Sequence, residues 1–251
     1  MPTKTIENAR KLQRQLESGV AAHAIPAAEA FDAHRPDGEK LALAPVLRAI
    51  GESCRRAFEH FAAAEQTVVR EDGEDRATRE SRDAAAASLR QSLSRIAAAI
   101  GATYGPATVE SLGLGGITPT VPDQLLTAGG RFLIATDPLP TLPPARDAWS
   151  VIDLAAARSS ILGNVEGLRH AMNTAAEETR QTQSARKARD EAEEAWKREA
   201  TLWATLARAV LRYSGQPDLA NRLLPSSTTI RHIEADAPPS DPATDTPNDP
   251  A

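Results

Sequence analysis

Few residue combinations in this chain have the types and spacing that chemistry requires. Glu166 and His170 lie four residues apart, so a helix would place both on one face, where they could ligate a metal. Di-iron bundles need paired Glu-x-x-His motifs on facing helices, and the sequence contains none. A surface contact is the simpler interpretation of Glu166 and His170. The sequence therefore predicts no metal site and no cofactor.

The other chemical motifs are equally incomplete. The run from Gly113 to Gly116 is glycine-rich like a phosphate-binding loop, but the Lys-Ser/Thr pair that should follow is missing. No Gly-x-Ser-x-Gly motif occurs, and Cys54, the single cysteine, falls on the apolar stripe of a predicted helix. We expect Cys54 to be a small buried side chain rather than a nucleophile. The sequence thus indicates a protein that is not an enzyme.

Two long helical patterns dominate the chain. In the first, from Leu41 to Ile100, apolar residues recur every seven positions. They form two series: Leu47, Cys54, Phe61, Val68, Leu89 and Ile96; and Leu43, Ile50, Ala57 and Ala64. Within the first series, residues 70–83 separate Val68 from Leu89, which follows three heptads later, and contain almost no apolar side chain. This stretch could be a hairpin turn at Gly73 or a solvated part of one continuous helix, and the retained heptad phase favours continuity.

The second pattern runs from Arg146 to Arg212 and has the same design. Its heptad series is Leu154, Ile161, Leu168, Ala175, Thr182, Arg189, Trp196, Trp203 and Val210. Antiparallel pairing of the two patterns places the charged residues 70–83 opposite residues 177–194. We expect each helix to be roughly 90–100 Å long at 1.5 Å per residue. The first long helix is expected to end at Gly101. The second is expected to start after Pro143-Pro144 and to end at Gly215.

These patterns predict an all-α fold: an elongated antiparallel helical bundle or coiled coil with two very long helices and a Gly/Pro-rich apolar insert at one end. The predicted segments are an N-terminal helix packing on the bundle (1–34), a long helix (39–101), the insert with one short helix (102–144), a second long helix (145–214), a short C-terminal helix and extension (215–233), and a disordered acidic Pro-rich tail (234–251). We also expect Pro26 to kink the first helix.

The insert, residues 102–144, carries the candidate partner-binding residues. Thr120 and Pro122 indicate a helix start, and the short helix should reach Ala135, with Gly129 weakening its middle. The candidate residues are Leu112, Leu114, Ile117, Val121, Leu125, Leu126, Phe132 and Leu133. Either these side chains fold over the end of the bundle, or they form a docking tip for a protein. A docking tip should be replaceable by a Gly/Ser loop without unfolding the bundle.

Composition limits the partners. The net charge is −5, from 29 basic and 34 acidic residues, and no basic patch is present that would bind nucleic acid. The charged N-terminus lacks the apolar core of a signal peptide, and no apolar run approaches 18 residues. We therefore expect a cytoplasmic protein. The long apolar stripes are wide for the helices available to cover them, which favours a homo-oligomer.

The function these observations favour is a non-enzymatic structural or protein-binding bundle: a spacer, adaptor or assembly subunit whose partner is a protein. The layout of long helices around an apolar insert resembles that of α-helical pore-forming toxins. That resemblance, which covers layout only, implies a membrane-interacting insert as the alternative. Pro119 and Pro122 interrupt the apolar run, so an inserted backbone would leave polar groups unpaired in lipid. We accordingly expect no leakage from liposomes.

Overall fold

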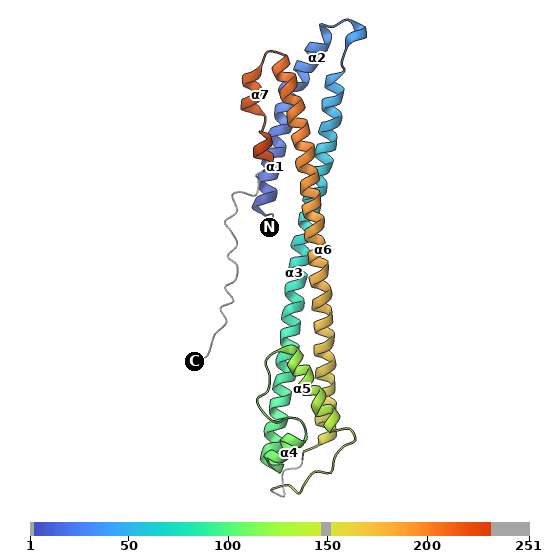
Figure 1. Cartoon of the computed structure of the whole chain (residues 1–251), viewed down its shortest axis with the longest axis vertical. Helices are drawn as coiled ribbons and strands as arrows, with labels where there is room; N and C mark the ends of the chain where they lie inside the picture. The colour runs from blue at the N-terminus through green and yellow to red at the C-terminus, as the bar shows by residue number, and fades with distance from the viewer. Residues whose placement is uncertain (1–2, 147–151, 232–251) are drawn as a thin grey trace. The chain divides into compact units, whose positions relative to one another are not determined.

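A computed structural model describes residues 3–146 and 152–231 of the chain (Figure 1). All regular structure in these residues is helical, without a β-strand, which confirms the predicted all-α class. The elements in chain order are α1 (Lys4–Gly19), a π-helical stretch (Val20–Ala24), α2 (Ile25–Ala33), a 3-10 turn (Asp37–Glu39), α3 (Leu43–Tyr104), α4 (Pro106–Ser111), α5 (Pro122–Ala135), α6 (Leu154–Tyr213), α7 (Pro217–Leu223) and α8 (Ser227–Arg231).

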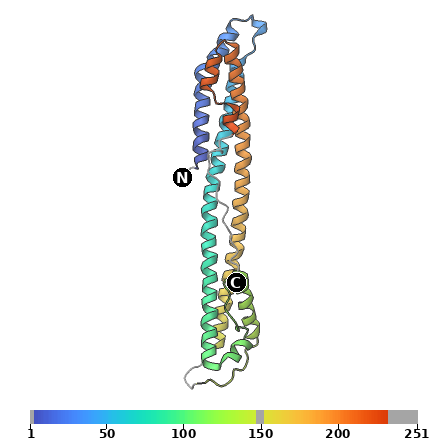
Figure 2. The ribbon, with the colours of Figure 1, turned by 60° about the vertical axis from the view of Figure 1, so that its left-hand side comes forward.

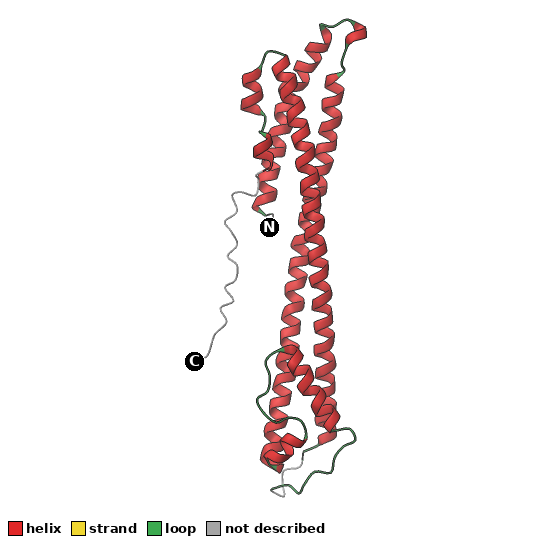
Figure 3. Cartoon of the chain, viewed as in Figure 1, coloured by secondary structure: helices red, strands yellow, loops and turns green. Residues whose placement is uncertain are grey.

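The chain forms two compact units. Unit 1 consists of Met1–Val69 and Ser184–Ala251, and unit 2 of Arg70–Gln183. Helices α3 and α6 each contribute one part to unit 1 and one part to unit 2, and in both units they lie side by side (Figures 1 and 2). The helices α1, α2, α7 and α8 belong to unit 1, whereas α4 and α5 belong to unit 2. In both units the described residues form helices and connecting loops (Figure 3).

Both long helices are continuous, as the heptad phase predicts. α3 has 62 residues and passes through Gly73 without a break. α6 has 60 residues and passes equally through its charged middle. A single glycine costs an α-helix only about 1 kcal/mol relative to alanine, so Gly73 alone does not end α3.

Contacts within each unit show that α3 and α6 run antiparallel. In unit 1, the Trp203 indole lies so close to Gly51 that an added Cβ would come within 2.6 Å of its Cζ2 atom. Later in α3, Glu65 pairs with Arg189, which comes earlier in α6, at 3.6 Å.

Unit 2 shows the same order of contacts. The Thr179 hydroxyl donates a hydrogen bond of 3.1 Å to Asp75, and the side-chain amide of Asn164 donates one of 2.9 Å to the Ser92 hydroxyl. The predicted pairing of the two long helices is therefore present in each unit.

The core of unit 1 is centred on Trp196, which is fully buried. Its indole stacks on Phe61 with ring centroids 5.9 Å apart, and its Nε1 donates a hydrogen bond of 2.9 Å to Gln13 of α1. Cys54 is also fully buried, and burial raises the pKa of its thiol to about 12. This confirms the prediction that Cys54 is a small core residue, since a thiol held protonated is a poor nucleophile.

Some helix ends differ from the prediction. Gly101 is helical rather than a cap, and α3 continues to Tyr104. Gly105 follows with φ of 97°, a left-handed conformation that glycine adopts without steric cost, so the chain turns there instead. Pro26 lies in the first turn of α2, directly after the π-helical stretch Val20–Ala24. Proline cannot donate the backbone hydrogen bond of a regular α-helix, and the α-helical pattern is interrupted by the π-helical stretch just before it.

The insert contains two helices, α4 and α5, rather than the one that was predicted. Between them the chain takes positive φ angles at Gly113 and Gly116, which separates the two helices. α5 begins at Pro122 and ends at Ala135 as expected, but its N-cap residue is Val121, so Thr120 does not cap it.

The start of α6 also differs. α6 begins at Leu154, not after Pro143-Pro144, and the Oδ1 atom of Asp153 accepts a hydrogen bond of 2.9 Å from the amide of Ala156. An aspartate cap of this kind satisfies a free N–H group of the first helical turn. At the other end, α6 stops before Gly215, where φ is 75°, as predicted. The predicted acidic tail, residues 234–251, lies outside the described residues.

Candidate functional site

The structure divides the candidate residues of the insert into a buried and an exposed group. Leu112, Leu125 and Phe132 are buried in the core of unit 2, where they join side chains of α3 and α6. Leu114, Leu126 and Leu133 are partly buried and pack against the same core. Six of the eight candidates therefore stabilise the unit. Only Ile117, which is 96% exposed, and Val121, which is 47% exposed, face solvent.

Gly129 allows α5 to pack closely on α6. A Cβ at this position would lie 2.5 Å from the Cγ2 atom of Val165, closer than real Cβ contacts come. The sequence predicted only that Gly129 weakens the middle of this helix. The structure shows what the glycine provides: the buried side of α5, with Leu125 and Phe132, lies directly against the long helices.

The outer side of the insert carries large apolar side chains. Ile134 is 78% exposed and Leu139 is 51% exposed, in addition to Ile117 and Val121. Four of the ten large apolar side chains that the described residues expose thus lie between residues 117 and 139. Neither Ile134 nor Leu139 was among the predicted candidates. The missing signal was the α5 periodicity: Ile134 follows Leu133 and Phe132, and three adjacent helical positions cannot all face one core.

A second feature lies in the charged middle of α3, residues 70–83, where the sequence favours a solvated stretch of continuous helix. Glu71 is seven residues after Ala64 and Asp75 is seven after Val68, so both continue the heptad positions. Each is buried, with 7% and 8% of its surface exposed. The continuous helix was predicted correctly, but the solvated interpretation is wrong for these two residues. The heptad register itself was the signal that could have found them.

Polar side chains on α6 face these buried carboxylates. The Thr179 hydroxyl donates a hydrogen bond of 3.1 Å to Asp75, which also forms an ion pair of 2.7 Å with Arg79. The Thr182 hydroxyl donates a hydrogen bond of 3.4 Å to the backbone carbonyl of Glu71. The two charged stretches thus meet as predicted, and the Thr179 hydroxyl together with Arg79 satisfies the buried charge of Asp75.

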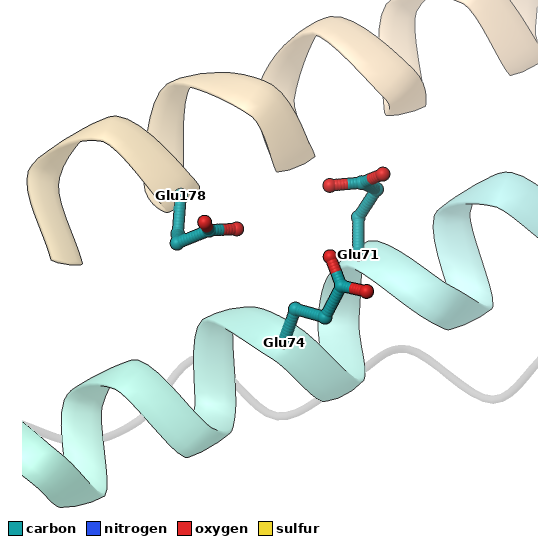
Figure 4. A group of neighbouring side chains, drawn as sticks. All are labelled: Glu71, Glu74 and Glu178. Carbon is teal, nitrogen blue, oxygen red and sulfur yellow. The ribbon is translucent and has the colours of Figure 1, made fainter. Parts of the chain in front are cut away.

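Three glutamates converge in this region, and we call them the acidic cluster: Glu71 and Glu74 on α3, and Glu178 on α6 (Figure 4). One carboxylate oxygen from each lies within 4.8 Å of the others. Carboxylate oxygens at such distances are the ligand type that hard divalent cations prefer. In the described residues this is the one group of three potential ligands, and Glu166 and His170 are not part of it.

Comparison with known proteins found no protein family, no curated protein and no solved structure that matches this chain. Within the described residues, none of the helices combines the length and the apolar character needed to cross a bilayer. Any assignment of function therefore depends on the chemistry of the insert and of the acidic cluster.

Proposed function

We propose that the chain is a non-enzymatic helical scaffold, a spacer, adaptor or assembly subunit, that binds a partner protein through the outer side of its insert. The observation that carries this proposal is the exposure of Ile117 and Ile134 on a segment whose inner side is fixed in a core. Exposed apolar patches on folded proteins commonly mark interaction sites, and these exposed side chains of the insert are the ones that would supply such a patch.

The supporting contacts favour a preorganised docking surface. The close approach of Gly129 to Val165 and the burial of Leu125 and Phe132 hold α5 in one position. A rigid surface loses little conformational entropy on binding, which improves affinity for a given area. The net charge of −5 without a basic patch supports a protein partner rather than nucleic acid.

The proposal includes a cytoplasmic location. It also allows the partner to be a second copy of the same chain, since a homo-oligomer would cover exposed apolar residues as well. We do not favour the alternative of a membrane-interacting protein. Pro119 and Pro122 stand in the apolar part of the insert and oppose its conversion into one long membrane helix.

The test compares partner capture by three forms of the full chain. The double variant Ile117→Asp/Ile134→Asp should lose at least about tenfold in captured partner, because two buried charges cost several kcal/mol at an apolar interface. Leu202→Asp, which changes a 53% exposed leucine on α6 in unit 1, should capture as much as the wild type. Quantitative affinity capture from cell extract provides the measurement. Equal capture by all three forms would refute the docking role of the insert.

A further inference from the structure

The acidic cluster contains buried oxygens that lack partners. Glu71 is more than nine-tenths buried, and its Oε2 atom has no hydrogen-bond partner. Glu178 is half-buried, but its Oε2 atom is covered and also has no hydrogen-bond partner. Figure 4 shows the carboxylates of Glu71 and Glu178 extending toward each other across the gap between α3 and α6. Buried carboxylate oxygens without a partner are costly, and each calls for a proton or a cation.

The charge around these oxygens is only partly balanced. Arg70 donates a hydrogen bond of 2.7 Å to Oε1 of Glu71, and its Nε atom lies 4.0 Å from Glu74. Arg70 is itself exposed, with 65% of its side chain accessible. Three carboxylates and one guanidinium sum to a formal charge of −2 (three negative charges minus one positive charge). This is the charge that one divalent cation neutralises.

We propose that the acidic cluster binds a hard divalent cation of the Mg²⁺, Ca²⁺ or Mn²⁺ class and thereby links α3 to α6 within unit 2. Glu71 and Glu74 supply ligands from one turn of α3, and Glu178 supplies one from α6. Mg²⁺ and Mn²⁺ commonly keep water molecules in their remaining coordination positions, which suits a site of three carboxylates of which one, that of Glu74, belongs to an exposed residue.

The packing around the cluster holds the carboxylates in position for this role. Thr182 binds the backbone carbonyl of Glu71, and Thr179 binds Asp75 one helical turn further along α3. These hydrogen bonds fix the register of the two helices at the cluster. The short hydroxyl side chains also occupy positions where larger apolar residues would otherwise fill the gap between the helices.

Isothermal titration of the full chain with MnCl₂, CaCl₂ and MgCl₂ tests the proposal. The wild type should bind at least one of these cations saturably at one site per chain. Glu178→Gln should weaken this binding at least about tenfold, since it removes a charged ligand. Glu177→Gln removes the neighbouring carboxylate, whose side chain is 56% exposed and pairs with Arg180, and should leave binding unchanged.

A second measurement covers the case in which a variant folds poorly. The cation should raise the Tm of the wild type and of Glu177→Gln, whereas NaCl at matched ionic strength should not. Glu178→Gln should show no rise in Tm with the cation, although its circular dichroism spectrum remains helical. The proposal is overturned if none of the three cations binds the wild type saturably. It is equally overturned if Glu178→Gln binds as tightly as the wild type, because the ion would then be held elsewhere on the acidic surface.

Discussion

Replacement of Trp196 by alanine is expected to lower the free energy of unfolding of unit 1 by about 4 kcal/mol, in the range found for large aromatic side chains in cores. The indole is fully buried, stacks on Phe61, and meets Phe58 edge-on at 5.7 Å between ring centroids. Its loss creates a cavity among these rings. It also removes the stronger of the two hydrogen bonds that the buried Gln13 side chain accepts, and leaves the Gln13 oxygen with only the weak donor of the Cys54 thiol at 3.3 Å.

Tyr213→Ala is the matched control, because it removes an aromatic ring from the same helix at a position that is 83% exposed. We expect a change below about 0.5 kcal/mol there. Urea unfolding followed by circular dichroism measures both variants. Similar, small losses for Trp196→Ala and Tyr213→Ala would contradict the arrangement of the unit 1 core.

Replacement of residues 112–134 by a short Gly/Ser loop is expected to abolish the cooperative unfolding of unit 2. If the insert were only a docking tip, as one interpretation of the sequence has it, this exchange should leave the bundle folded, but the burial of several insert side chains leads to the opposite expectation. Leu112, Leu125 and Phe132 are core residues, and each such deletion costs about 2–5 kcal/mol. Their sum approaches the whole stability of a typical domain, which is about 5–15 kcal/mol.

The control for this exchange is the double variant Ile117→Asp/Ile134→Asp, which changes only exposed side chains. It should unfold like the wild type in differential scanning calorimetry. If the loop-replaced chain instead kept the complete wild-type transition, the insert would not be part of the unit 2 core. This pair of variants also separates loss of binding from loss of folding, which simple removal of the insert does not.

Much of the fold was predictable because heptad spacing reports burial directly. Leu47, Cys54 and Phe61 are all fully buried, as their seven-residue spacing predicts. The same rule was abandoned at residues 70–83 because the side chains there are charged. Glu71 and Asp75 nevertheless keep the heptad positions and are buried. Heptad register therefore predicts burial here where residue type does not, and the neighbouring Thr179, Arg79 and Arg70 balance only part of the buried charge.

The insert was less predictable, because its residues lack a long repeat. Composition showed that it is apolar, but not which side chains reach the core. The difference between buried Phe132 and exposed Ile134 depends on how α5 lies on α6, and that position depends on the contact between Gly129 and Val165. Such tertiary contacts leave no periodic trace in a stretch of 14 residues, the length of α5.

The proposed docking role requires that one side of the insert is fixed in the core of unit 2 while Ile117 remains exposed to solvent. Thiol labelling of single cysteine variants measures this exposure. The one native cysteine, Cys54, should give no background signal, because it is fully buried and the pKa of its thiol is raised to about 12. With Ile117→Cys, we expect labelling by a disulfide reagent at nearly the rate of a free thiol. Leu125→Cys should react at least about a hundredfold more slowly, because reaction must wait for local opening. Equal rates for the two variants would contradict the account.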